Sequence, residues 1–434
     1  MSKRIAVIGA GPAGCTAAFE AARTGREVVL FEKEKSVGGR TRSHRSGGHV
    51  LDTGAGFFTN FYPRLKSYNK ELALENDVVR PSRQNVLIAG DISAPLALGS
   101  PISFMRFPLI DGADKLRMIW RTIGRTLRYR RMDLANPAAL ADLDTQSIAE
   151  DARRTLGEQA YQYLVRPGIE PFWYFSCEKV SQALYIGLQA KAADAVFYTY
   201  RSGMDVFCQT LANKVELRTG LGVSSIHPEK NRFRITYPGG KDVFDEVLIA
   251  TTANVAEKLV SEMPDTLVTP EQRNFLQSQE YTSNVLTSFR LPSGLLPDSD
   301  TRIPCGPGEN SVAAITVNSD KRSGSAEDLL TIYFRGEIAK ELLRTNKKTT
   351  FDRALSLARK VDRRLENLPL QPFHLVQRER AIPVHSVGRY RTSANFLDMQ
   401  KGPIVFAGDY LSTATVEGAI QTGQQAVAAL GRAS

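Results

Sequence analysis

Three glycines near the N-terminus have the spacing of a loop that binds phosphate. Gly9, Gly11 and Gly14 follow an apolar run at 5–8, and alanines recur over 17–22. The run predicts a buried parallel strand, and the alanines predict a helix that packs closely against it. Glycine permits the tight turn and close approach of the backbone, while free N–H groups at the helix start hold a diphosphate.

An acidic residue follows where a dinucleotide ribose would be held. The segment 28–31 predicts a second strand, and Glu32 comes directly after it. A carboxylate at this position accepts hydrogen bonds from both hydroxyls of the adenosine ribose. Because strand, helix, second strand and acid fall in register, we interpret the segment as a dinucleotide site rather than a purely structural turn.

A second glycine-rich segment comes soon after the acid and narrows the choice of dinucleotide. Gly38 and Gly39 allow backbone contact, Arg40 supplies a planar cation for a phosphate, and Thr41 follows. At this point the chain resembles the flavin-containing amine oxidase superfamily, which includes protoporphyrinogen oxidases and phytoene-type desaturases. In that superfamily the corresponding segment contacts FAD.

The resemblance recurs in four later segments. Segment 51–58 resembles the family's stretch beside the isoalloxazine ring, and 245–254 resembles the strand and loop behind the adenosine half. Segment 216–226 would place the Val223 backbone against adenine. Segment 402–430 resembles the C-terminal family motif, in which a strand leads into a helix.

The resemblance implies an FAD molecule, bound non-covalently, that contacts all of these segments. Asp409 would bind a ribityl hydroxyl, and N–H groups near Val416 would stabilise negative charge at flavin N1 and O2. Thr251 would lie near the pyrophosphate. The expected contacts are Gly9, Gly11, Pro12, Ala13, Gly14, Glu32, Lys33, Gly38, Gly39, Arg40, Thr41, Gly54, Ala55, Gly56, Phe57, Val223, Thr251, Gly408, Asp409, Thr415, Val416 and Ala419.

The chain is longer than one hydrophobic core normally serves, which predicts two domains. The expected fold class is α/β: a Rossmann-like FAD-binding domain of the GR2 type, with a second α+β substrate-binding domain of mixed sheet and helices. The flavin motifs place the first domain at 1–75, 200–285 and 396–434. The second would comprise 76–199, mainly helical, and 286–395, strands with one helix over 350–366.

Composition favours an ordinary globular protein, with 42% hydrophobic and 24% charged residues. We find no apolar signal region and no apolar run long enough to span a bilayer. The four cysteines are scattered without metal-binding spacing, which predicts reduced cysteines in a cytoplasmic protein and no metal site.

The net charge of +10 points to an anionic partner or to a solvated surface. No nucleic-acid-binding motif accompanies it. The densest basic cluster, 115–131, has apolar residues at helical spacing among arginines. This amphipathic helix would make peripheral contact with an anionic membrane, or it would be a lid helix that packs its apolar face inward. Of these two arrangements, a lid helix with its apolar face packed inward is the commoner one.

Two positions depart from the amine-oxidising branch of the superfamily. That branch usually carries a Lys in the strand beneath flavin N5, where this chain aligns Asn284, although Arg290 or another register would change the assignment. It also carries an aromatic pair facing the flavin. Here Thr415 takes one of those positions, and no Tyr or Trp lies within 411–420.

Other segments favour the desaturase and protoporphyrinogen oxidase branches. Segment 379–390 resembles a stretch of protoporphyrinogen oxidases, and His385 within it is the candidate catalytic residue, although a loop histidine beside proline is more often a surface residue. Phe172, Trp173 and Tyr174 would wall an apolar substrate pocket together with Asn284, or the aromatic residues would pack in a lid core.

The sequence therefore predicts an FAD-dependent oxidoreductase that removes two hydrogens from a hydrophobic or conjugated small molecule, with hydride transfer to flavin N5. Electrons would pass to oxygen or another acceptor. The alternative is an atypical amine or amino-acid oxidase that gives an imine and hydrogen peroxide. Non-catalytic escort proteins of prenylated GTPases share the architecture but have lost flavin contacts, whereas this chain keeps Glu32, Arg40 and Asp409.

Overall fold

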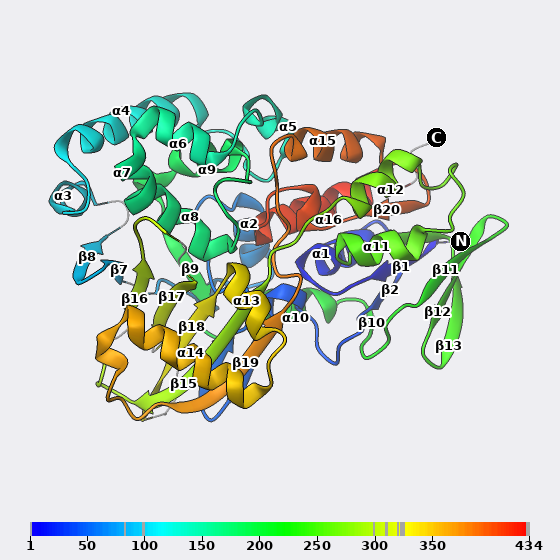
Figure 1. Cartoon of the computed structure of the whole chain (residues 1–434). Helices are drawn as coiled ribbons and strands as arrows, with labels where there is room; N and C mark the ends of the chain where they lie inside the picture. The colour runs from blue at the N-terminus through cyan, green and yellow to red at the C-terminus, as the bar shows by residue number, and fades with distance from the viewer. Residues whose placement is uncertain are drawn as a thin grey trace.

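A computed structural model describes residues 2–81, 84–97, 100–297, 300–308, 311–318, 321 and 326–430. A parallel sheet with its covering helices forms one half of the molecule, and a larger sheet with a separate group of helices forms the other (Figure 1). The α/β fold class with a second, mixed part is confirmed. The predicted domain boundaries stay a prediction.

The parallel sheet combines strands from distant parts of the chain. Its order is β10 (Glu216–Arg218), β2 (Glu27–Phe31), β1 (Arg4–Ile8), β14 (Glu246–Ile249) and β20 (Ile404–Phe406). All neighbouring strands run parallel. Their apolar residues are buried on both faces, which is why these strands appear in the sequence as continuous apolar runs.

Helices cover one face of this sheet, and a small antiparallel sheet with helices covers the other. The first layer is α1 (Pro12–Arg23), α2 (Pro63–Glu71), α10 (Val206–Ala212) and α16 (Val416–Ala429). The second is β11 (Ser225–Glu229), β12 (Arg232–Tyr237), β13 (Gly240–Phe244), α11 (Ala253–Val260) and α12 (Pro270–Gln277). At the crossing of α1 and α16, a Cβ on Gly423 would lie 2.5 Å from the Ala13 carbonyl oxygen, so glycine permits the close approach.

The larger sheet has seven strands. Their order is β19 (Gln371–Arg378), β15 (Asn284–Pro292), β18 (Glu327–Phe334), β17 (Val312–Asn318), β16 (Asp300–Pro304), β7 (Gln84–Ala89) and β8 (Ile92–Leu96). Neighbours are antiparallel except β16 and β7. One face packs on α13 (Gly336–Leu342) and α14 (Lys347–Val361).

The hairpin of β7 and β8 lies in a segment that we predicted to be mainly helical. Gly90, with φ of +58°, and Asp91 join its strands as a two-residue turn. That dipeptide between short apolar runs is a hairpin signal. The helix predicted over 350–366 ends earlier, because α14 stops at Val361 and a 3-10 turn, η6 (Arg363–Leu365), follows.

The remaining helices form a group with its own core beside the larger sheet (Figure 1). They are α3 (Pro101–Arg106), α4 (Gly112–Tyr129), α5 (Pro137–Leu140), α6 (Ile148–Leu156), α7 (Glu158–Ala160), α8 (Arg166–Trp173) and α9 (Gln182–Gln189). α15 (Arg389–Met399) packs against α5. Short strands β3 (Ser43–Ser46), β4 (His49–Asp52), β5 (Phe58–Thr59), β6 (Val78–Val79) and β9 (Phe197–Tyr200) connect the halves.

α4 contradicts the lid arrangement, in which its apolar face would pack inward. Its apolar residues Trp120 and Leu127 are 66% and 77% exposed. The inner face carries Met118 and a buried arginine instead: Arg125 pairs with Asp151 of α6 at 2.5 Å and with Gln189 of α9. A buried ion pair fixes the rotation of the helix and leaves its apolar stripe in solvent.

Candidate FAD and substrate site

A cavity of about 620 Å³ lies where the parallel sheet meets the larger sheet. The carboxyl ends of β1, β2 and β14 contribute Gly9, Glu32 and Thr251 to its wall. This edge of a parallel sheet is where open α/β folds bind their ligands. Strands β15, β16 and β17 supply the opposite wall.

The glycine loop forms the end of the cavity beside α1. Gly9 has φ of +102°, and a Cβ on Gly14 would lie 1.8 Å from the Gly9 carbonyl oxygen, so larger residues at both positions would disrupt the turn. Among the described residues, no side chain caps the start of α1 at Gly11. The N–H groups of the first helical turn are therefore available to an anion.

Glu32 is 7% exposed and lies at the end of β2. Its Oε2 accepts a hydrogen bond from the backbone N–H of Ala10 at 2.8 Å, and its Oε1 accepts one from Glu34 at 3.0 Å. An ionised carboxylate has about four lone-pair sites. Two lone-pair sites of the Glu32 carboxylate are therefore left to accept hydrogen bonds from the hydroxyls of a ribose.

The second glycine segment lies directly against the first. The Gly38 N–H donates to the Ala10 carbonyl at 2.7 Å, and a Cβ on Gly39 would lie 3.2 Å from the Gly11 Cα. Arg40 then reaches Asp409, with Nη2 and Oδ1 at 2.6 Å. Burial alone would lower the pKa of Arg40, but the Asp409 carboxylate raises it above its usual value.

Gly54, after β4, fits only as glycine. A Cβ there would lie 2.0 Å from the Arg40 carbonyl oxygen, while the neighbouring Ala55 N–H donates to that oxygen at 3.0 Å. Gly56 and Phe57 continue the same wall of the cavity. This close backbone packing leaves a flat surface of the kind that an aromatic ring system can contact.

The start of α16 completes the cofactor end. Thr415 caps the helix by accepting a hydrogen bond from the Gly418 N–H at 3.0 Å, and Val416 and Ala419 line the cavity. Glu417 points elsewhere, because its carboxylate accepts hydrogen bonds from the backbone N–H groups of Arg64 and Leu65 in α2. Burial raises the pKa of Glu417.

The structure brings nearly all predicted FAD contacts to this one cavity. Of the predicted set, only Gly14 and Gly38 lie behind its wall, where they shape the two glycine turns. Free helix N–H groups, a carboxylate with spare acceptor sites and a partly buried arginine match the diphosphate and ribose of a dinucleotide. The residues present therefore fit FAD.

Aromatic side chains wall the substrate end. Phe172, Trp173 and Tyr174 line the cavity, and Trp173 donates its indole N–H to the Ala414 carbonyl at 3.1 Å. Phe57 packs edge-to-face on Phe172, with ring centroids 5.8 Å apart. The hydrogen bond from Trp173 holds the end of α8 against the C-terminal motif.

Asn284 is buried in the cavity wall and donates to the Phe334 carbonyl at 3.2 Å. It pairs across the sheet with Arg378 of β19. Arg290, the other candidate for the lysine position, lies outside the cavity lining and contacts the Phe373 ring at 4.8 Å.

His385 does not reach the cavity, which differs from our expectation that it faces substrate. It is 1% exposed and stacks on Tyr390, with ring centroids 5.0 Å apart. Burial, followed by the charge of Arg389, lowers its pKa to about 3. The ring lies behind the backbone of Asp409, where it supports the C-terminal motif.

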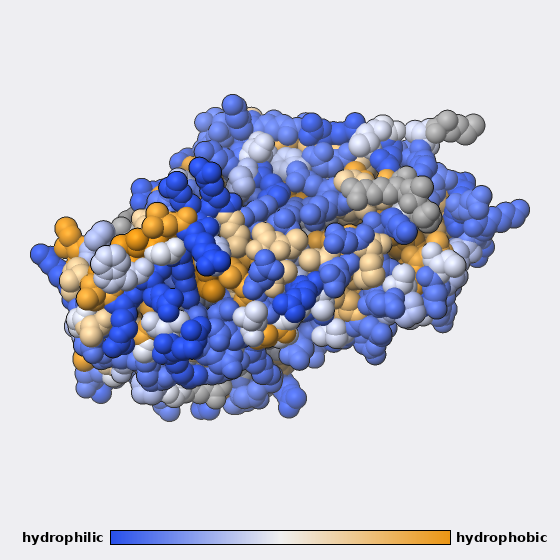
Figure 2. Space-filling view, turned by 90° about the horizontal axis from the view of Figure 1, so that it is seen from above, coloured by the Kyte–Doolittle hydropathy of each residue, from blue (hydrophilic) through white to orange (hydrophobic). Residues whose placement is uncertain are grey.

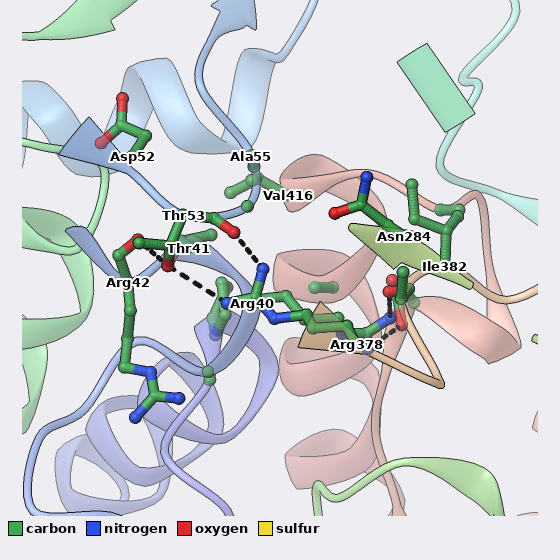
Figure 3. A pocket seen from close by; sticks show the side chains of 18 of the residues that line it. Arg40, Thr41, Arg42, Asp52, Thr53, Ala55, Asn284, Arg378, Ile382 and Val416 are labelled. Carbon is green, nitrogen blue, oxygen red and sulfur yellow. Dashed lines mark hydrogen bonds and ion pairs between the residues drawn. The ribbon is translucent and has the colours of Figure 1, made fainter. Parts of the chain in front are cut away.

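Sequence reasoning missed Arg378. Its guanidinium is directed at Thr53, donating to the carbonyl and, at 3.1 Å, to the Oγ1 (Figure 3). Within the described part of the chain it has no carboxylate partner. Burial and the neighbouring charges of Arg42 and Arg40 lower its pKa to about 10. No pattern in its local sequence distinguishes it from a surface arginine.

The described ranges hold neither a candidate metal site nor a candidate membrane-spanning helix. No group of three or more His, Cys, Asp or Glu side chains is arranged there to hold a metal ion. No helix in those ranges combines the length and the apolar character needed to cross a bilayer.

The chain belongs to the family described as flavin containing amine oxidoreductase, whose profile matches residues 12–431. It is accordingly a flavin-dependent oxidoreductase, and its cofactor is FAD, bound non-covalently.

Individual curated relatives match a smaller part of the chain than the family profile does, at low sequence identity. Protoporphyrinogen oxidase 2, chloroplastic/mitochondrial, of Arabidopsis thaliana is 26% identical over 166 residues, 38% of this chain and 31% of that protein. Coproporphyrinogen III oxidase of Staphylococcus aureus (strain NCTC 8325 / PS 47) is 22% identical over 299 residues, 59% of this chain and 62% of that protein. These matches span less than two thirds of either relative.

Solved structures share the fold over the whole chain. Cyclohexylamine oxidase from Brevibacterium oxydans IH-35A has a TM-score of 0.74 at 16% identity, covering 99% of this chain and 98% of its own. A CLA-producing fatty acid isomerase from P. acnes has a TM-score of 0.75 at 15% identity, with 98% of both chains covered. At these identities the likeness shows the fold alone.

Proposed function

We propose that the protein removes two hydrogens from a hydrophobic or conjugated small molecule, as the protoporphyrinogen oxidases and desaturases of its family do. FAD supplies the acceptor for a hydride and its electron pair. The substrate gives up the second hydrogen as a proton to solvent, and oxygen or another small acceptor reoxidises the flavin. The predicted FAD contacts are proposed as the binding residues.

The observation that carries this proposal is the charge of the substrate end. The described acidic residues in the cavity wall are Glu32, Glu34, Asp52, Glu379 and Asp409. Glu32 and Asp409 belong to the cofactor end. Glu34 pairs with Arg42, and Asp52 pairs with Lys321. The side chain of Glu379 is 77% exposed. None is left to bind a protonated amine among the aromatic residues.

Arg378 adds a positive charge to the same wall without a carboxylate to neutralise it among the described residues. A protonated amine would be repelled there, whereas a neutral or anionic substrate would not. Arginine binds carboxylates through two parallel hydrogen bonds. The arrangement therefore favours an apolar substrate that carries a carboxylate over the alternative amine or amino-acid oxidase.

The chain's own contribution to the chemistry is placement. No histidine lies among the described cavity-lining residues, and His385 is held elsewhere. Trp173, Tyr174 and Asn284 would orient the substrate and exclude water, which supports catalysis by positioning rather than by a dedicated side-chain base.

Anaerobic reduction of the bound flavin tests the proposal. Holoprotein is mixed with a porphyrinogen, a polyene carboxylic acid or a primary amine, and bleaching of the flavin absorbance is recorded by stopped flow. We expect reduction by a carboxylate-bearing conjugated substrate, with weaker saturation in Arg378→Met and partial recovery in Arg378→Lys. Reduction by the amine alone, improved by Arg378→Met, would establish the amine oxidase alternative.

A further inference from the structure

α3 and α4 present an unusual concentration of apolar side chains to solvent. Six of the nine large apolar side chains that are exposed in the described part of the chain lie on these two short segments. They are Ile102, Met105, Leu116, Trp120, Ile123 and Leu127, and we call them the α3–α4 face. The orange side chains at the left end of the molecule lie at the end where α3 and α4 are found (Figure 2).

The spacing shows that the α4 part of this face is one continuous stripe. Leu116, Trp120, Ile123 and Leu127 follow at intervals of four, three and four residues, which places them on one side of a helix. A surface helix normally turns such a stripe toward the protein core. Here Arg125 points inward to Asp151 instead, so the stripe has no partner within the described chain.

Basic side chains surround the stripe. Segment 101–131 holds eight Lys or Arg and two Asp, a net charge of +6 from eight minus two. Arg106, Arg121 and Arg128 are exposed, and within the described residues none of them forms an ion pair. Of the two acids, Asp114 is buried and pairs with Arg117.

We propose that the α3–α4 face docks the protein on the surface of an anionic lipid bilayer. A helix with an exposed apolar stripe and flanking arginines lies in the plane of the interface, with its apolar side chains among the acyl chains and its cations at the headgroups. Trp120, at the centre of the stripe, suits the boundary between the two regions.

The combination of charge and exposed apolar side chains favours an anionic bilayer over a second copy of the chain or a nucleic acid. A second copy of the chain, seated face to face, would bring two basic surfaces together, and like charges oppose such contact. A nucleic acid would match the arginines but would leave the apolar stripe without a partner. An anionic amphiphilic surface matches both features. The proposal does not depend on the identity of the substrate.

Vesicle flotation of the FAD-loaded protein tests it. One set of vesicles is phosphatidylcholine alone, and the other contains about one third phosphatidylserine. We expect binding to the anionic vesicles only, with release as salt rises because screening shortens the electrostatic range to about 8 Å at physiological ionic strength. Replacing Trp120 and Leu127 together with Ser should lower the partition coefficient by about tenfold or more.

Exposed positions keep the variants folded and supply matched controls. Arg121→Gln with Arg128→Gln removes charge, and Arg125 stays intact because it is paired in the interior. Val387→Ser removes an exposed apolar side chain outside the face and should leave binding unchanged. FAD content and urea unfolding of each variant are measured alongside, so that loss of binding is not confused with loss of fold.

Fluorescence reports the depth of docking. The chain has two tryptophans, and only Trp120 lies on the α3–α4 face. Its emission should shift to shorter wavelength with anionic vesicles, and Trp120→Phe should abolish the shift while binding persists. Equal binding to both vesicle types, or no binding, would overturn the proposal. So would a dimer that the Trp120 and Leu127 double variant dissociates without any vesicle binding in the parent.

Discussion

Replacing Glu32 with Gln is the sharpest test of the cofactor end. The two carboxylate oxygens already accept the N–H groups of Ala10 and Glu34, at 2.8 and 3.0 Å. An amide keeps one oxygen with two lone-pair sites and turns the other position into an NH2 donor. In Glu32→Gln one backbone N–H therefore faces a donor, and the ribose loses an ionised acceptor.

The expected loss follows from these contacts. Hydrogen bonds to a charged group contribute about 1.5 to 3 kcal/mol, so the Kd for FAD should rise roughly 10- to 150-fold. The apoprotein should also lose stability, by about 1 to 3 kcal/mol, because a buried N–H loses its acceptor.

Titration of apoprotein with FAD, followed by quenching of flavin fluorescence, measures the Kd, and urea unfolding measures the stability. Glu27→Gln is the matched control, because Glu27 begins the same strand with its side chain 57% exposed and pairs with Arg4 outside the cavity. A Kd for Glu32→Gln within about twofold of the parent would refute the assigned ribose contact.

Four other replacements, one of them a control, test residues in the cavity wall and behind it. Gly54→Ala should lose FAD because its Cβ would lie 2.0 Å from the Arg40 carbonyl, whereas Gly124→Ala in α4, outside the cavity lining and with no atom within 4 Å of its Cβ, should keep it; equal flavin-to-protein absorbance ratios would contradict this. Asp409→Ala should lower FAD content by breaking the ion pair with Arg40, and full retention after gel filtration would argue against that role. His385 has a pKa of about 3 when folded and 6.5 when unfolded, so the unfolded chain binds more protons in this window and stability falls as pH drops below 6.5. Between pH 6.5 and 5 the parent should lose about 2 kcal/mol more than His385→Gln in urea unfolding, and parallel losses would show that the histidine does not titrate as buried.

The predicted residues that the structure brings to the cavity lie mainly in short motifs with local rules. Gly9, Glu32 and Arg40 follow from the order of strand, turn, helix and acid, and each needs only its immediate neighbours to be placed. The fold class followed for the same reason. Asp409, from the other end of the chain, depended on the family resemblance.

The residues that the sequence missed depend on partners far along the chain. Arg125 points inward because it pairs there with Asp151 of α6 and Gln189 of α9. The rotation of α4 about its own axis is therefore set by other helices. Arg378 reaches the cavity because β19 pairs with β15, a register between residues 94 positions apart at Asn284. The periodicity of apolar residues predicts a helix, but it does not predict which face of that helix the rest of the protein will bury.

The bond between Arg40 and Asp409 has a consequence for biosynthesis. It joins residues separated by 369 positions, so Arg40 gains its partner only after synthesis has passed β20. A ribosome-bound intermediate that lacks β20 and α16 has an incomplete cofactor site and leaves part of α1 uncovered. We therefore expect FAD to bind fully only after β20 and α16 have been made. Because a ligand of the native state stabilises it by mass action, a shortage of flavin should lower the yield of folded protein.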